Sequence, residues 1–180
     1  MKGKNMDKND SKNMVKQQPV VFFWKDTKEN GCFSNWYRRK FVVDGREYLH
    51  VEQYMMAQKA MLFNDTKRYE AILQTEDPAR CKKLGRQVSS FDPAAWNAVK
   101  YDIVKTANRA KYEQNPELKE ALLNTGNAVL VEASPYDSIW GIGITAKEAA
   151  GMDPSEWPGQ NLLGKILAEL RAEFAGGADR

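Results

Sequence analysis

Two charged residues, Glu52 and Lys59, have a spacing that suits catalysis. The surrounding pattern predicts a helix, on which residues seven apart project within about 20° of one another and lie roughly 10 Å apart along the axis. An acid and a base placed in this way could flank one ligand. The alternative is a charged stripe that faces solvent, together with Gln53 and Lys67. The apolar run 54–57 favours a largely buried helix, on which an acid and a base require a chemical explanation.

Further residues suited to holding a sugar and a base occur later in the chain. Trp96 opens an amphipathic stripe, where it is either a core residue or a platform on which a base stacks. The segment 137–143 combines an acid, an aromatic ring and two flexible glycines, which suits binding a sugar and a base while backbone amides approach a phosphate. These residues are Asp137, Trp140, Gly141 and Gly143.

A second glycine-rich segment, 159–164, leads into the last predicted helix and contains Asn161. Free backbone N–H groups and the helix dipole at such a position favour an anion such as a pyrophosphate. A plain N-cap is the alternative interpretation. We count Asn161 among the expected ligand-binding residues.

The histidine and cysteine content limits the chemistry. His50 is the single histidine, and the two thiols, Cys32 and Cys81, lie 49 residues apart, so no spacing resembles a structural zinc site. No motif surrounds a nucleophilic serine or cysteine. We therefore expect neither a metal nor a cofactor, and carboxylates and lysines remain as the reactive groups.

The charge balance gives little support for a duplex-binding surface. The net charge of +3 arises in residues 1–18, which hold five lysines and two aspartates. The rest of the chain is balanced, so a net-basic folded surface is not implied. There is no apolar run of about 18 residues and no short apolar secretory segment at the start, so we expect an intracellular, cytoplasmic protein without a membrane partner.

The elements that must position these residues can be read from the sequence periodicity. Strands are expected at 20–24 and 128–132, with a hairpin at 41–48 around the turn Asp44-Gly45. Helices are expected at 51–64, 66–74, 78–84, from Pro93 to about 114, at 117–123, and from 159 or 161 to just before Gly176. The long loop 134–160 is expected to be functional.

These elements predict an α+β fold that is mainly α: a single compact helical domain with a small antiparallel sheet or hairpin. The strands are expected in hairpins and not in βαβ alternation. Residues 1–18 form a predicted disordered tail rich in Lys and Asn, 19–175 the domain, and 176–180 a flexible C-terminus.

Several ordered motifs carry a family resemblance. They are Phe33-Ser34-Asn35, Val51-Glu52-Gln53-Tyr54, Ala57-Gln58-Lys59-Ala60, Leu84-Gly85-Arg86, residues 110–115, residues 123–126, Asp137 with 140–143, and residues 159–164 before Glu169 and Arg171. From about Phe22 to Phe174 the chain resembles the NADAR family, named for its link to NAD and ADP-ribose. It is similar to bacterial N-glycosidases that act on riboflavin-pathway intermediates and to guanine ADP-ribosyl hydrolases.

The resemblance implies a mainly helical fold with a small sheet, and a site built from Glu52, Lys59, Trp96, Asp137 and Trp140. We expect Glu52, Lys59 and Asp137 to be catalytic. The expected ligand-binding residues are Trp96, Trp140, Ser34, Asn35, Gly141, Gly143, Asn161 and Arg86. The sequence departs from the family pattern at two places. Loop 145–157 is longer than usual in the family, and Gln53 occupies a position where histidine is common.

The function implied is hydrolysis of a ribose C1′–N bond, whose oxocarbenium-like transition state needs nearby negative charge and help for the departing base. Glu52 is expected as the essential carboxylate, and Lys59 offers a second route through a Schiff base. The expected substrate is ADP-ribosylated guanine in nucleic acid. A ribosylamino-pyrimidine phosphate of riboflavin biosynthesis is the alternative, and a non-catalytic reader of ADP-ribose or NAD is the alternative of another class.

Overall fold

The computed structural model describes residues 18–177 of the chain. The predicted disordered tail therefore lies outside the described residues except for Gln18, and so do residues 178–180 of the predicted flexible C-terminus. Within the described range, Gly176 is the last residue of a helix. No helix in this range is long and apolar enough to cross a membrane.

The mainly helical α+β fold is confirmed, and most predicted elements lie within a few residues of their expected positions. The strands are β1 (Val20–Phe23), β2 (Phe41–Val43), β3 (Arg46–Tyr48) and β4 (Val129–Glu132). The helices are α1 (Val51–Leu62), α2 (Thr66–Leu73), α3 (Pro78–Gly85), α4 (Pro93–Glu113), α5 (Pro116–Leu123), α6 (Ala146–Ala149) and α7 (Leu162–Gly176). Short 3₁₀ turns occur at Gly31–Phe33 and Pro154–Glu156.

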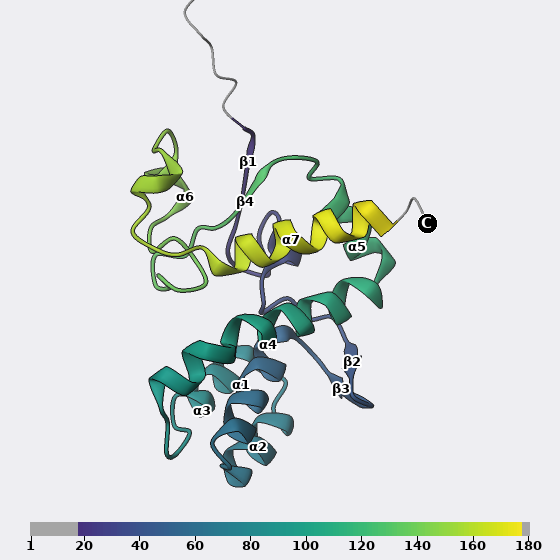
Figure 1. Ribbon diagram of the computed structural model, residues 1–180, viewed down its shortest axis with the longest axis vertical. Helices are drawn as coiled ribbons and strands as arrows, with labels where there is room; N and C mark the ends of the chain where they lie inside the picture. The colour runs from purple at the N-terminus through teal and green to yellow at the C-terminus, as the bar shows by residue number, and fades with distance from the viewer. Residues whose placement is uncertain (1–17, 178–180) are drawn as a thin grey trace, which may run out of the picture.

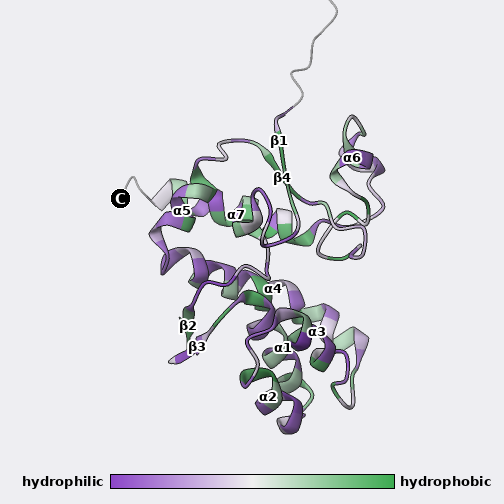
Figure 2. Ribbon diagram, turned by 180° about the vertical axis from the view of Figure 1, so that it is seen from behind, coloured by the Kyte–Doolittle hydropathy of each residue, from purple (hydrophilic) through white to green (hydrophobic). Residues whose placement is uncertain are grey.

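The elements stack in a simple order (Figure 1). The β1–β4 pair packs on α7, α7 packs on α4, and α4 packs on α1, which α2 and α3 cover from the other side. In Figure 2 the two central strands carry the hydrophobic colour, whereas the helices show both colours along their lengths. This is the pattern of amphipathic helices that bury one face each.

The pairing of the strands corrects one expectation. The predicted hairpin is confirmed, since β2 and β3 pair antiparallel across Asp44 and Gly45, which have φ values of 50° and 76°. The expectation that all strands form hairpins is wrong, because β1 pairs with β4 in parallel, with Phe23 opposite Glu132. Parallel pairing needs a crossover connection, and here the connection contains helices α1 to α5. Local sequence patterns do not reveal a pairing between segments so far apart.

The start of α1 is fixed by buried hydrogen bonds. The His50 side chain caps the helix by accepting from the backbone N–H of Gln53 at 3.0 Å. The Gln53 side chain is buried, accepts from the N–H of Leu49 at 2.8 Å, and donates to the carbonyls of Ile72 and Thr75 at 3.3 and 3.1 Å. Gln53 thus ties α1 to the end of α2, and this holds the first turn of α1, which carries Glu52, in a fixed place.

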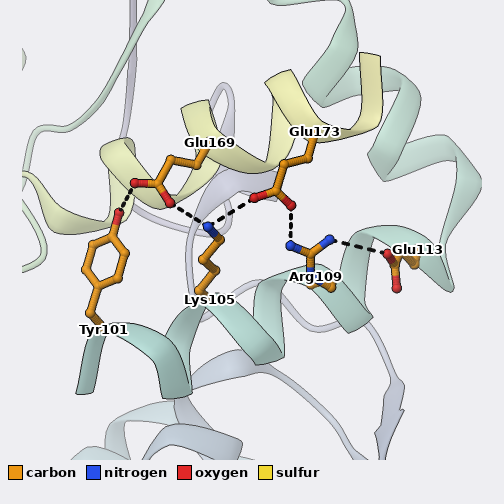
Figure 3. A network of polar contacts seen from close by, with 6 residues as sticks. All are labelled: Tyr101, Lys105, Arg109, Glu113, Glu169 and Glu173. Atoms are coloured by element: carbon orange, nitrogen blue, oxygen red, sulfur yellow. Dashed lines mark hydrogen bonds and ion pairs between the residues drawn. The ribbon is translucent and has the colours of Figure 1, made fainter. Parts of the chain in front are cut away.

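An exposed polar network joins α4 and α7 (Figure 3). Lys105 Nζ lies 2.6 Å from Glu169 Oε2 and 3.0 Å from Glu173 Oε1, and the Tyr101 hydroxyl donates to Glu169 Oε1 at 2.7 Å. Arg109 also pairs with Glu173. A single exposed ion pair contributes little to the free energy of unfolding. The network therefore supplements the apolar packing that holds α4 against α7.

The start of α7 corrects a second expectation, that of an anion site at 159–164. The backbone N–H groups of Asn161, Leu162 and Leu163 donate to the carbonyls of residues 141, 139 and 140 at 3.0, 3.2 and 3.1 Å. These groups therefore bind the loop 137–143 and do not offer a free anion-binding helix end. The Asn161 side chain accepts from the N–H of Glu132 at 3.1 Å and donates to the carbonyl of Leu130 at 2.9 Å.

Asn161→Ala should destabilise the protein by about 2–4 kcal/mol, because it leaves a buried carbonyl and a backbone N–H of β4 without partners. Urea unfolding followed by circular dichroism measures the change. Gln160→Ala is the matched control, since Gln160 is exposed, and it should stay within about 0.5 kcal/mol of the wild type. Equal stability of the two variants would show that Asn161 does not hold β4 to α7.

Candidate active site

Glu52 lies in the first turn of α1 and is buried, with 3% of its surface exposed. The indole Nε1 of Trp36 donates to Glu52 Oε2 at 3.2 Å, while Oε1 is buried and has no hydrogen-bond partner among residues 18–177. Burial raises the pKa of Glu52 to about 7, against the lowering effects of the Lys82 charge and the Trp36 bond. The carboxyl is therefore poised to give or take a proton near neutral pH.

The segment 34–36 places Trp36 over this carboxyl. Its backbone is joined to α1, because Glu52 N–H donates to the carbonyl of Asn35 at 3.0 Å. The Asn35 side chain accepts from Asn108 Nδ2 at 3.1 Å, and Ser34 Oγ accepts from the N–H of Trp36 at 3.1 Å. Ser34 and Asn35 thus support the position of Trp36.

A buried lysine also holds the backbone of this segment in place. Lys111 of α4 is fully buried and donates to the carbonyls of Cys32 and Ser34 at 2.7 and 3.2 Å. Burial lowers the pKa of Lys111 to about 7. Two backbone carbonyls of the 32–36 region are therefore satisfied by one amine, and this fixes the backbone from which Trp36 projects.

Glu52 opens onto a cleft with three adjoining hollows. The Glu52 hollow, of about 270 Å³, is lined by Glu52, Met55, Met56, Lys59, Lys82, Arg86, Tyr136, Asp137, Ser138, Ile139 and Trp140. The Glu132 hollow, of about 280 Å³, is lined by Trp24, Lys25, Asp26, Thr27, Ser34, Trp36, Lys82, Glu132, Ser134, Tyr136 and Asp137. The α3 hollow, of about 600 Å³, is lined by Trp36, Ala79, Lys82, Lys83, Arg86, Gln87 and Tyr136. Lys82 and Tyr136 line all three, so the hollows lie side by side, and we refer to them together as the cleft.

Asp137 organises the loop that faces Glu52. Its Oδ1 accepts from the N–H groups of Ile139 and Trp140 at 3.0 and 2.9 Å, and its Oδ2 lies 3.3 Å from Lys82 Nζ. Gly143, whose φ is 75°, donates its N–H to the Asp137 carbonyl at 3.1 Å. Asp137 therefore shapes the loop 137–143 and adds a fixed negative charge to the cleft.

Lys59 is half-buried on the wall of the Glu52 hollow. Its amine lies 4.0 Å from the ring centroid of Phe91 and 5.8 Å from that of Trp96. Burial, followed by the charge of Arg86, lowers the pKa of Lys59, while Glu52 opposes this shift. A lowered pKa increases the fraction of free amine, which is the form that can act as a nucleophile.

The structure brings together only some of the residues that the sequence nominated. Glu52, Lys59, Arg86, Asp137 and Trp140 line the Glu52 hollow, and Ser34 lines the Glu132 hollow.

The other nominated residues occupy different places. Trp96 is 9% exposed and lies in the core against Lys59, away from the lining of these three hollows. Asn35 supports Trp36, and Asn161 holds β4. Gly141 and Gly143 shape the loop, and a Cβ on Gly141 would lie 2.6 Å from the Glu132 carbonyl.

Several cleft residues were missed by the sequence reasoning, among them Trp36, Lys82, Glu132 and Tyr136. Trp36 directly follows the Ser34-Asn35 motif and could have been nominated from that position. Glu132 ends an apolar strand, where an acid is unusual. Lys82 lies among other charged residues on α3 and carries no signal in a single sequence.

The fold and the cleft together define an α+β domain with a buried carboxyl suited to acid–base hydrolysis. Residues 22–175 match the model of the NADAR domain, and the chain belongs to this family. N-glycosidase R617 of Acanthamoeba polyphaga mimivirus is 47% identical over 161 residues, which cover 85% of this chain and 95% of that protein. Riboflavin biosynthesis protein VVA0006 of Vibrio vulnificus is 30% identical over 92% of this chain and 41% of that protein.

A solved relative supports the fold. N-glycosidase YbiA of Escherichia coli is 35% identical over 161 residues, which cover 89% of this chain and 92% of that protein. Its NMR structure superposes with a TM-score of 0.75 at 34% identity, covering 91% of this chain and 89% of that chain. The α+β arrangement described above is therefore shared with an experimentally determined structure.

Trp36→Phe should raise the pKa of Glu52 above its wild-type value, because the indole hydrogen bond favours the ionised carboxylate. The carboxyl carbon signal of Glu52, followed by ¹³C NMR against pH, measures the shift. Trp24→Phe is the control, because it removes an indole from the cleft without removing a bond to Glu52. An unchanged Glu52 titration in Trp36→Phe would contradict the assigned hydrogen bond.

Proposed function

We propose that this chain hydrolyses the C1′–N bond between a ribose and a heterocyclic base, with Glu52 as the essential carboxylate. The observation that carries the proposal is a buried carboxyl on a cleft wall, with one oxygen bound by Trp36 and the other without a partner in residues 18–177. Membership of the NADAR domain family, and relatives named N-glycosidases, support a hydrolase that acts on N-glycosyl bonds.

In this mechanism Glu52 moves one proton. Its ionised form takes a proton from a water molecule that attacks C1′, and the protonated form then passes that proton to the nitrogen of the departing base. The transition state resembles an oxocarbenium ion, so the fixed negative charge of Asp137 and the charge of Glu52 stabilise it. Trp140 contributes an aromatic surface to the same hollow.

Lys59 provides a second route within the same hollow. Its amine attacks C1′ while the protonated form of Glu52 gives its proton to the nitrogen of the departing base. One amine proton passes to the ring oxygen O4′ as the ribose opens to a protonated imine, and water hydrolyses the imine to regenerate the amine. The half-buried position and lowered pKa of Lys59 support this route.

We propose ADP-ribosylated guanine in nucleic acid as the substrate. Lys82, Lys83 and Arg86 line the α3 hollow, which is large and gives three cationic side chains for a diphosphate. A ribosylamino-pyrimidine phosphate is the second candidate, favoured by the relative named a riboflavin biosynthesis protein. A non-catalytic reader of ADP-ribose or NAD would use the same cleft without turnover.

Glu52→Gln should lower kcat/KM by at least about 100-fold, because it removes the proton carrier while preserving shape. Ligand affinity should be retained, and the melting temperature at pH 8 should not fall, since a buried acid with a raised pKa is destabilising when ionised. Glu70→Gln, on an exposed position of α2, is the matched control and should keep full activity. Binding without turnover in the wild type would support the reader instead.

The wild type should release ADP-ribose from an oligonucleotide that contains ADP-ribosylated guanine and leave unmodified guanine in the strand, as detected by mass spectrometry of the products. A parallel incubation with a ribosylamino-pyrimidine phosphate tests the second candidate. Faster turnover of the pyrimidine compound would overturn the substrate proposed first, while leaving the class of reaction intact.

Borohydride trapping during turnover distinguishes the two routes. The imine route predicts a reduced sugar adduct on the peptide that contains Lys59, with no adduct in Lys59→Met. An active enzyme that yields no adduct would restrict Lys59 to stabilising charge in the cleft.

A further inference from the structure

The Glu132 hollow is lined by a half-buried acid that the mechanism above does not use. Glu132 is the last residue of β4, and its Oε2 is buried with no hydrogen-bond partner in the described part of the chain. The nearby Lys82 amine pairs with Asp137. A shielded carboxyl oxygen that the fold leaves without a partner is costly, so the position of Glu132 on the wall of a hollow suggests a ligand.

The backbone of Glu132 is held rigidly. Its N–H donates to Asn161 Oδ1 at 3.1 Å, and its carbonyl accepts from the N–H of Ile142 at 2.9 Å. The strand also pairs with β1 at this residue, opposite Phe23. The carboxyl is therefore presented to the hollow from a fixed support, as a specific recognition group requires.

Aromatic side chains contribute to the lining of the same hollow. Trp24 and Tyr136 have ring centroids 5.9 Å apart with an interplanar angle of 50°, and Trp36 also lines this space. Tyr136 is 84% exposed, whereas aromatic side chains in folded domains are usually largely buried. Aromatic surfaces of this kind bind planar heterocycles by stacking.

The carboxyl limits which heterocycle suits the hollow. An ionised carboxylate has two acceptor oxygens and binds two adjacent N–H donors side by side. A ring N–H next to an exocyclic amino group is such an edge, and it occurs in guanine and in 2-amino-4-oxopyrimidines. Burial raises the pKa of Glu132 to about 8, with Asp137 and Glu52 adding to the shift and Lys82 opposing it. The two donors would replace the proton that the raised pKa places on the Glu132 carboxyl, and that proton passes to solvent.

We infer that Glu132 recognises the ring N–H and adjacent amino group of the substrate base in the aromatic hollow beside Glu52. The inference rests on the proposed function, because it assigns the base to the Glu132 hollow while C1′ lies at Glu52. Trp36 is suited to join the two, since its indole lines this hollow and binds Glu52 Oε2. Either candidate substrate suits the Glu132 hollow when its base presents a ring N–H beside an amino group, because the hollow contacts only that part of the substrate.

Titration of the full chain with 2-amino-4-oxopyrimidine and with 4-oxopyrimidine tests the inference, because the two compounds differ only in the amino group. The indole N–H signals of Trp24 and Trp36 in NMR spectra report occupancy. The wild type should bind the amino compound at least about tenfold more tightly. Glu132→Gln should lose most of this preference, because the amide offers one acceptor in place of two, while Glu29→Gln, at an exposed position, should keep it.

Equal binding of the two compounds by the wild type would overturn the inference, and so would a preference that persists in Glu132→Gln. The wild-type comparison does not depend on a variant that folds, and Glu132→Gln should melt no lower than the wild type because it removes an acid whose ionised form is disfavoured by its surroundings. Turnover of the substrate is measured separately. A preference without turnover would contradict only the proposed function, and turnover without a preference only the role of Glu132.

Discussion

The burial of Glu52 beneath the Trp36 indole is the constraint on which the rest of the site depends. A carboxyl removed from water loses hydration that favours its charge, and a single hydrogen bond at 3.2 Å restores only part of that loss. The resulting pKa of about 7 makes the group an effective proton carrier at neutral pH. The same burial costs stability, so the surrounding structure must hold the acid in place.

Buried polar residues provide that support. Gln53 ties the first turn of α1 to the end of α2, and Lys111 holds the carbonyls that precede Trp36. Asn161 joins β4 to α7, which fixes both Glu132 and the loop that carries Asp137. Residues in three separate regions of the chain are thereby brought to one cleft by hydrogen bonds that are largely shielded from water.

Local patterns predicted the helices, the Asp44-Gly45 hairpin and the pairing of Glu52 with Lys59 on one helix, because period and turn chemistry are local properties. The parallel β1–β4 pair could not be predicted, because it depends on contacts between segments that five helices separate. For the same reason, only part of the site could be predicted from the sequence. The roles of Lys111, Asn161 and Glu132 follow from tertiary partners, whereas Glu52 was recognisable from its motif. Asn161 illustrates the difference, since its glycine-rich setting suggested an anion site and its contacts show a structural role.

The pH dependence of kcat/KM reports the titration of the free enzyme, so it measures directly whether Glu52 is the proton carrier. Glu52 acts in its ionised form, and burial raises its pKa to about 7. We therefore expect kcat/KM to rise about tenfold per pH unit below that value and to level off above it. A rise centred near 4.5, the ordinary value for a glutamate, or no dependence on pH across this range, would contradict this role of Glu52.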